Sequence, residues 1–178
     1  MQTSEPLENP KIFIEVPTTT EQLDRVRTLM RAFIVWHRHR YVEDIKLIDE
    51  YFDATAFEEE LALLPGKYAP PHGMLMLAFH EDIPAGCVAV QEIDPHTCEM
   101  KKMFVYTHLR GKGVGKALAQ ASIDRARAIG YRSIRLTPGF RQYETKALYH
   151  SLGFRVIEPY YELPEKLRNW VVFMELNL

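Results

Sequence analysis

The chain has 178 residues, of which 47% are hydrophobic, and a formal net charge of −2 at neutral pH. This length supports one hydrophobic core, and no Ser/Gly-rich linker or charge block interrupts it, so residues 1–178 are expected to form a single domain. The charge argues against partners such as nucleic acid or an anionic membrane, since both require clustered Lys and Arg in excess.

Export and membrane insertion are not indicated either. Residues 1–10 lack the apolar core of a signal peptide, and no stretch approaches the ~18 apolar residues of a membrane span. The two cysteines, Cys87 and Cys98, are expected to be reduced and to fill the core. We therefore expect a cytoplasmic protein, and the sequence leaves its oligomeric state, including a homodimer, open.

The first part of the chain predicts a strand and two helices. Residues 12–16 form a short apolar run, and Thr18 to Thr20 offer N-caps for a helix that begins near Glu21. Apolar residues then recur every three or four positions as far as Ile34. The basic end of this helix, residues 37–41, is expected to be solvated, with contact to an acidic substrate as the alternative. A second helix is expected over residues 54–64, followed by an ordered loop over residues 67–73.

The remainder predicts a strand meander followed by alternating helices and strands. The meander covers residues 74–80, 85–93 and 97–106. Alternation in its third strand places Glu99, Lys101, Met103 and Val105 on one face and Met100, Phe104 and Tyr106 on the other. Helices are expected over residues 114–129 and 143–152, and strands over 133–137, 154–157 and 170–178. This order predicts an α/β fold with a mixed sheet, since early strands are hairpin-linked and middle ones helix-linked.

The most informative segment is a glycine-spaced turn between a strand and a helix. Gly111, Gly113 and Gly115 alternate with other residues, so that several backbone N–H groups can converge on one anion. The following helix adds its unpaired N-terminal donors. Arg110, Lys112 and Lys116 add positive charge. This pattern predicts a pyrophosphate site, and its spacing fits neither a dinucleotide fingerprint nor a P-loop. The alternatives are a plain connection with solvated cations and another nucleotide-binding site.

Two signatures resemble those of the GNAT superfamily of N-acetyltransferases. The run Arg110-Gly111-Lys112-Gly113-Val114-Gly115 is similar to its R-x-x-G-x-G motif, and residues 142–154 are similar to N-x-x-A-x-x-L-Y-x-x-x-G-F. The second match has Gln142 where Asn is usual and Thr145 where Ala is usual. The resemblance covers nearly the full chain. It implies about seven strands and four helices, with the sheet splayed open between the strands at residues 98–106 and 133–137.

The resemblance also implies a site for acetyl-CoA. The pantetheine arm would insert into the gap, where a splayed strand offers unpaired backbone groups. The residues implied to hold coenzyme A are Met103, Phe104, Val105, Arg110, Gly111, Lys112, Gly113, Val114, Gly115, Lys116, Gln142 and Tyr149. The side chains of Met103, Phe104 and Val105 are otherwise plain core, as the side chain of Tyr149 could be.

Acyl transfer to an amine requires a proton acceptor for the amine and a proton donor for the departing thiolate. Tyr149 is the candidate acid, because a phenol stays protonated at neutral pH. Glu99 is the candidate base, and the alternatives are a water chain or a plain salt bridge from Glu99 to Lys101 or Lys102. By resemblance, the backbone N–H of Val105 would polarise the thioester carbonyl. The histidines show no metal-ligand spacing, and no nucleophile elbow occurs, so we expect no metal and no acyl-enzyme.

The sequence thus predicts an acetyl-CoA-dependent N-acetyltransferase that acts on the primary amine of a small molecule by direct attack. Acetylation of a protein or peptide amine is one alternative, and a non-catalytic acyl-CoA-binding sensor is another. The acceptor pocket is expected to involve residues 35–41 and 67–73.

Overall fold

A computed structural model describes residues 11–178, which form a seven-stranded mixed sheet in the order β1-β2-β3-β4-β5-β7-β6. The strands are β1 (Ile12–Glu15), β2 (Met74–His80), β3 (Ile83–Asp94), β4 (Thr97–Val105), β5 (Ser133–Leu136), β6 (Arg155–Val156) and β7 (Met174–Asn177). The sheet has the predicted number of strands. All its neighbouring strands are antiparallel except β4 and β5, which are parallel.

Residues 11–178 contain six α-helices where four were expected. They are α1 (Thr20–Arg40), α2 (Ile45–Tyr51), α3 (Ala54–Ala62), α4 (Val114–Ile129), α5 (Tyr143–Ser151) and α6 (Glu165–Arg168). The two additional helices, α2 and α6, have seven and four residues. Helices of two turns or fewer are too short to show the apolar periodicity from which a helix is predicted.

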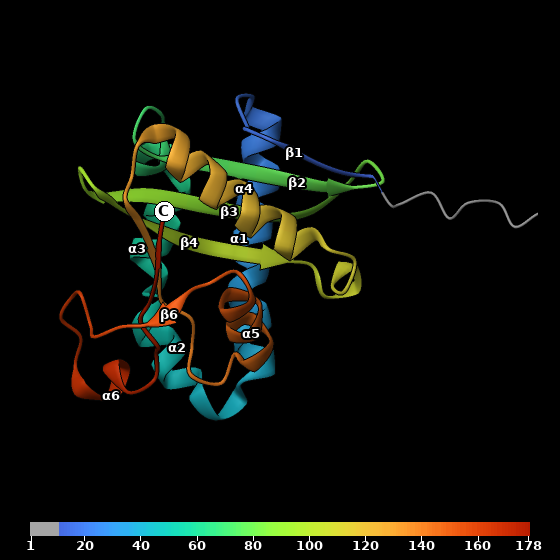
Figure 1. The fold of residues 1–178 in the computed structure, drawn as a ribbon. Coiled ribbons are helices and arrows are strands. Elements are labelled where there is room, and N and C mark those ends of the chain that lie inside the picture. The colour runs from blue at the N-terminus through green and yellow to red at the C-terminus, as the bar shows by residue number, and fades with distance from the viewer. Residues whose placement is uncertain (1–10) are drawn as a thin grey trace, which may run out of the picture.

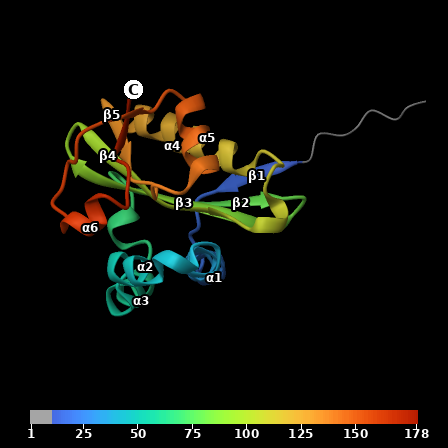
Figure 2. The ribbon, with the colours of Figure 1, turned by 90° about the horizontal axis from the view of Figure 1, so that it is seen from below.

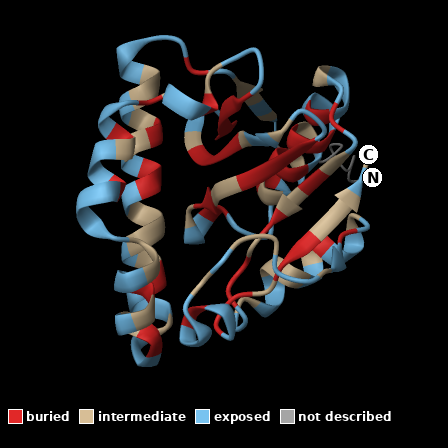
Figure 3. Ribbon diagram, turned by 90° about the vertical axis from the view of Figure 1, so that its left-hand side faces the viewer, coloured by how far each residue is buried: buried red, intermediate tan, exposed pale blue. Residues whose placement is uncertain are grey.

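The helices cover the sheet on both faces (Figure 1). Helices α1, α2 and α3 lie on one side, and α4 and α5 lie on the other (Figure 2). One apolar cluster joins the sheet to α4 and α5, and a second joins it to α1 and α3. Buried residues therefore concentrate in the central strands and on the helix faces that point at them (Figure 3).

The parallel ladder between β4 and β5 is short. It pairs Thr97 with Ser133, Cys98 with Ile134 and Glu99 with Arg135, and then ends. The remainder of β4 stays paired with β3 on its other side. The sheet therefore opens at the position that the resemblance implied, and one edge of β4 is free of any neighbouring strand beyond Glu99.

The predicted alternation of side chains in β4 is wrong for the end of this strand, because β4 contains a β-bulge. Ala89 of β3 pairs with Lys101 and Cys87 pairs with Phe104, so Lys102 and Met103 together oppose Val88. Lys102 has a φ of 55°, which is unusual for a residue other than glycine. The extra residue reverses the alternation. Val105 consequently packs in the α4-side cluster with Met100, whereas Glu99 and Phe104 face α1.

The end of α1 also differs from the expectation of a solvated basic segment. The helix begins as predicted, with Thr19 as N-cap in a capping box with Gln22. At its end, Arg38, His39 and Arg40 are exposed, but His37 is buried with 1% of its surface accessible. Its ring contacts those of Phe33 and Trp36, with centroids 4.2 and 4.9 Å away. Burial is the main reason why the pKa of His37 falls from 6.5 to about 4, and the positive charge of Arg110 contributes.

This burial predicts a pH dependence of stability. In the unfolded chain His37 takes up a proton near pH ~6.5, whereas in the folded protein it stays neutral until about pH 4. As the pH falls through this window, the free energy of unfolding should therefore decrease, by on the order of 3 kcal/mol from this residue. Urea unfolding of the wild type and of H37Q between pH 7 and pH 4.5 measures it.

The curve of H37Q should be flatter than that of the wild type, because glutamine does not titrate. The exposed His39 on the same helix provides the control, and H39Q should retain the wild-type pH dependence. Parallel curves for the wild type and H37Q would contradict a neutral buried His37.

Candidate active site

A cavity of about 1130 Å³ runs through the opening in the sheet. Its walls are the free edge of β4, the C-terminal half of α1, the start of α4, helix α5 and the segments around residues 136–139 and 160–171. The two ends of this cavity differ in chemistry. Backbone N–H groups and cations lie at the α4 end, and a buried carboxylate with several tyrosines lies at the other.

The glycine-spaced turn lies at the α4 end and presents its backbone to the cavity. No residue among 11–178 accepts a hydrogen bond from the backbone N–H groups of residues 111–116. Gly111 and Gly113 have φ values of 75° and 88°, a conformation that favours glycine. Gly115 has room for a side chain, since an added Cβ would lie 3.8 Å from its nearest neighbours. Six successive free donors, in the turn and the first turn of α4, form an arrangement that suits an anion.

The side chains of this turn have separate roles. Lys112 and Lys116 are exposed, whereas Val114 is buried in the α4-side cluster and offers only its backbone to a ligand. Arg110 points back from the turn: its Nε donates to the carbonyl of Val105 at 3.0 Å, and its guanidinium lies 4.1 Å from the ring centroid of Trp36. The positive charge of Arg110 is therefore directed at α1 and not at the turn.

The free edge of β4 offers backbone groups next to this turn. Tyr106 N donates to Ala85 O on β3 at 2.9 Å, so the preceding residue, Val105, directs its own N–H and C=O to the opposite edge, towards the opening. The side chains of Phe104 and Val105 are buried in the two core clusters, and Met103 is half-buried. By the same alternation the N–H and C=O of Phe104 point to Cys87 on β3, so of these two residues only Val105 offers main-chain groups to the opening.

Tyr149 reaches the same cavity from α5. It is 5% exposed, and the one hydrogen-bond partner of its hydroxyl within residues 11–178 is the sulfur of Met103, 3.9 Å away. Burial raises the pKa of the Tyr149 hydroxyl above its ordinary value. The phenol therefore remains protonated at neutral pH and can donate a hydrogen bond.

Gln142 lies at the N-cap position of α5, where its side chain crosses to α1. Its Nε2 contacts the Nε2 of His37, while the Nδ1 of His37 lies 2.9 Å from the carbonyl oxygen of Phe33. Both Gln142 and His37 line the cavity. The sequence included His37 only in the expected acceptor segment 35–41 and gave it no individual role, because a histidine in a basic helix end resembles a solvated one.

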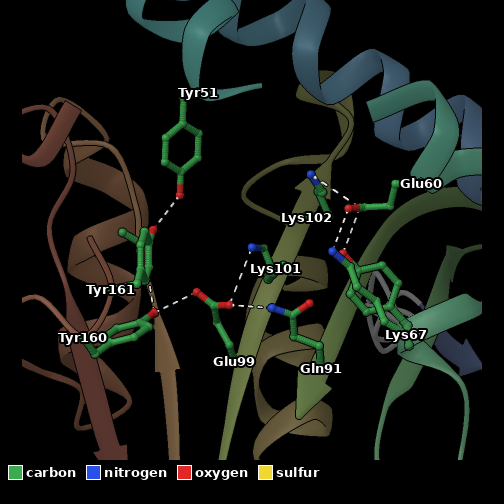
Figure 4. Close-up of polar contacts among 11 residues, drawn as sticks. Tyr51, Glu60, Lys67, Gln91, Glu99, Lys101, Lys102, Tyr160 and Tyr161 are labelled. Atoms are coloured by element: carbon green, nitrogen blue, oxygen red, sulfur yellow. Dashed lines mark hydrogen bonds and ion pairs between the residues drawn. The ribbon is translucent and has the colours of Figure 1, made fainter. Parts of the chain in front are cut away.

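Glu99 lies at the opposite end, where the β4–β5 ladder stops (Figure 4). It is 5% exposed, so it is not a surface carboxylate. Its Oε1 accepts from the hydroxyl of Tyr160 at 2.8 Å, and its Oε2 accepts from Gln91 Nε2 at 2.9 Å. Lys101 Nζ lies 3.6 Å from Oε2, which makes one of the two anticipated salt bridges.

Lys102, the other anticipated partner of Glu99, lies elsewhere. The bulge directs it towards α3, where its Nζ is 3.6 Å from Glu60 and 4.9 Å from the ring centroid of Phe57 (Figure 4). Burial lowers the pKa of Lys102 to about 8, and Glu60 opposes this shift. Lys102 thus pairs with Glu60 and leaves Glu99 with Lys101.

Tyrosines surround Glu99. Burial and the charge of Glu99 both raise the pKa of Tyr160, so Tyr160 keeps its proton and its hydroxyl donates a hydrogen bond to Glu99. The hydroxyls of Tyr51 on α2 and Tyr161 lie 3.0 Å apart. This end is therefore walled by α2 and the segment around Tyr160, not by residues 67–73, which do not line the cavity within the described chain. Of residues 35–41, Trp36, His37 and Arg40 line it.

Two further observations concern the part of the chain that the structure describes. It contains no group of three or more His, Cys, Asp and Glu side chains placed to hold a metal ion. None of its helices is both long and apolar enough to cross a membrane.

Comparison with known proteins places this site in a family. A family model described as "Acetyltransferase (GNAT) family" matches residues 33–154. An uncharacterised N-acetyltransferase of Schizosaccharomyces pombe is 35% identical over 147 residues, covering 77% of this chain and 88% of that protein. The N-acetylaspartate synthetase of Danio rerio is 34% identical over 118 residues, covering 65% of this chain and 42% of that longer protein.

The fold is also that of solved acetyltransferases. The PaiA N-acetyltransferase of Thermoplasma acidophilum, whose structure contains coenzyme A, superposes with a TM-score of 0.69 at 17% identity, covering 94% of this chain and 99% of that one. At this identity the likeness concerns the fold alone. The family model and the relatives show more: the chain belongs to the GNAT family of acetyltransferases and is an acetyl-CoA-dependent N-acetyltransferase.

Proposed function

We propose that this enzyme transfers the acetyl group of acetyl-CoA to the primary amine of a small molecule, by direct attack within a ternary complex. The observation that carries the proposal is the single cavity that joins the free N–H groups of residues 111–116 to the buried carboxylate of Glu99. Bound acetyl-CoA would supply an activated thioester. Residues 111–116 would hold its pyrophosphate, and the edge of β4 at Met103 and Val105 would hold its pantetheine arm, whereas the backbone of Phe104 is paired with β3.

A compact acceptor is favoured by the walls around Glu99. The hydroxyl contact between Tyr51 and Tyr161 joins α2 to the segment before α6, so an extended peptide would have to separate them. Lys101 beside Glu99 offers a cation to an acceptor that also carries a carboxylate. The zebrafish relative, by its name, makes an acetylated amino acid of that kind.

Glu99 is proposed as the general base. The carboxylate accepts three hydrogen bonds or ion-pair contacts, from Tyr160, Gln91 and Lys101, and it has one further lone-pair direction for a substrate ammonium or a bridging water. Removal of the ammonium proton frees the nitrogen lone pair, which forms the new C–N bond; the nitrogen would then lose a second proton to solvent, and Glu99 would return the first proton to solvent. The N–H of Val105 would stabilise the negative charge on the carbonyl oxygen.

Tyr149 is proposed as the general acid. When the C–S bond breaks, the thiolate of coenzyme A gains from protonation, and a buried phenol without a strong acceptor is suited to donate. Solvent then restores the proton to Tyr149. The proposal is tested by the release of free thiol from acetyl-CoA with a panel of acceptors: amino acids including aspartate, polyamines, small aromatic amines and peptides. Turnover with peptides alone would contradict the proposal of a small-molecule acceptor and favour a peptide amine.

The first prediction concerns the proposed pyrophosphate site. G115V should weaken coenzyme A binding at least about tenfold while the melting temperature changes little, because Gly115 has no positive φ and its added Cβ meets only ordinary contacts. Calorimetric titration measures the affinity. The affinity of G115A, which has a smaller side chain, should lie between those of G115V and the wild type. Gly113 is unsuitable for this test, since its φ of 88° would strain any side chain. Unchanged affinity in a folded G115V protein would exclude this site.

The second prediction concerns Tyr149. Y149F should lower kcat and kcat/KM equally, by roughly 10²-fold or more, with unchanged coenzyme A affinity, because only the proton-donating hydroxyl is lost. Steady-state kinetics measures kcat and kcat/KM, and calorimetry measures the affinity for coenzyme A. The matched control is Y143F, which alters an exposed tyrosine on the same helix and should behave as the wild type. A pure rise in KM would make Tyr149 a binding residue.

The third prediction concerns Glu99. E99Q should lower the rate at neutral pH by about 10²-fold and remove the acidic limb of the rate–pH profile, with little effect on coenzyme A affinity. The control is E50Q, since Glu50 lines the same cavity but pairs with Lys166. If the acidic limb persists in E99Q, the base is water or another group.

A further inference from the structure

The contact between His37 and Gln142 crosses the cavity between two elements that are far apart in the sequence. His37 belongs to α1 and is 1% exposed, and Gln142 lies at the start of α5. Both line the cavity next to the free edge of β4. A buried polar contact at this place fixes a side chain that is otherwise free to rotate.

The hydrogen bonds of His37 determine which nitrogen carries its proton. Nδ1 lies 2.9 Å from the carbonyl oxygen of Phe33, which can only accept, so Nδ1 must be protonated. The ring is neutral at physiological pH, and Nε2 therefore carries a lone pair. The atom that faces this lone pair is the amide nitrogen of Gln142, a donor.

This contact in turn fixes the orientation of the Gln142 amide. Since Nε2 of Gln142 donates to His37, its Oε1 is the atom left for another partner, and no residue among 11–178 donates to it. Gly139 lies beside this amide, since a Cβ added there would be in ordinary contact with Gln142 Nε2 at 3.4 Å.

We propose that His37 is a positioning residue for coenzyme A: as the Nδ1-protonated tautomer it holds the amide of Gln142 so that Oε1 accepts a hydrogen bond from an N–H or hydroxyl of the pantetheine arm. This inference rests on the proposed cofactor site. It also gives a reason for glutamine at position 142, where the family signature has asparagine, because the longer side chain of glutamine can reach α1. His37 itself touches neither the thioester nor the acceptor.

A purely structural His37 would give different results. In that case its replacement would lower the melting temperature and act independently of Gln142. If His37 orients Gln142, the two side chains form one unit, and removing either loses the same hydrogen bond to the cofactor.

The experiment compares two amides at position 37. H37N can still donate to the Phe33 carbonyl but is too short to reach Gln142, whereas H37Q can place its carbonyl oxygen near the position of Nε2. We expect H37N to weaken coenzyme A binding about tenfold, with H37Q close to wild type. In turnover assays KM for acetyl-CoA should rise in H37N while kcat stays constant.

The second site gives an independent measurement. Q142M keeps the length of the side chain but lacks the amide, and it should weaken coenzyme A binding about tenfold. The double variant H37N/Q142M should bind coenzyme A no more weakly than Q142M alone. H39Q, at an exposed position of the same helix, is the control and should bind as the wild type.

The outcomes separate this inference from the proposed function. A wild-type protein that does not bind coenzyme A would overturn the cofactor site itself. If the wild type binds coenzyme A normally, any one of three results would overturn the role of His37 alone. These are wild-type affinity in H37N, equal losses of affinity in H37N and H37Q, and an additive, hundredfold loss of affinity in the double variant. If H37N does not fold, wild-type affinity for coenzyme A in Q142M would likewise overturn the role of His37.

Discussion

The short parallel ladder between β4 and β5 is the constraint on which the site depends. The two strands share three residue pairs and are then held apart, β4 by its long pairing with β3 and β5 by its pairing with β7. Backbone groups along a strand must find partners, and on one edge β4 has no neighbouring strand beyond Glu99, where Arg110 Nε donates to the carbonyl of Val105. A ligand with amides of its own can supply them. The opening is therefore a consequence of how the sheet divides its hydrogen bonds.

The bulge at Lys102 arranges the chemistry along that edge. Without the extra residue, Glu99 and Val105 would share a face; with it, Val105 packs under α4 while Glu99 and Phe104 face α1. The bulge also sends Lys102 to Glu60 on α3. Lys101 is left beside Glu99, so this carboxylate is paired with Lys101 and not with Lys102.

Several features of the fold could be predicted because their causes are local. Thr19 caps α1 through residues three positions away, and the glycines at 111 and 113 adopt the positive φ that their residue type favours. The strand meander and the L-Y-x-x-x-G-F end of α5 are likewise short-range patterns. By contrast, α2 and α6 were missed, because their stability comes from an apolar cluster that joins Ile48 to Leu167 and Trp170, more than a hundred residues later.

The sequence by itself determined the order of the strands and the four longer helices, the family resemblance, the glycine-spaced turn and the candidate residues Tyr149 and Glu99. Tertiary structure decided what surrounds them. It buried His37 against Gln142, joined Glu99 to Tyr160, and turned Arg110 away from the turn onto Trp36. The physical reason is the range of the interactions. Backbone conformation and helix caps depend on a few neighbouring residues, whereas burial, hydrogen-bond partners and pKa shifts depend on side chains that the sheet brings together from distant parts of the chain.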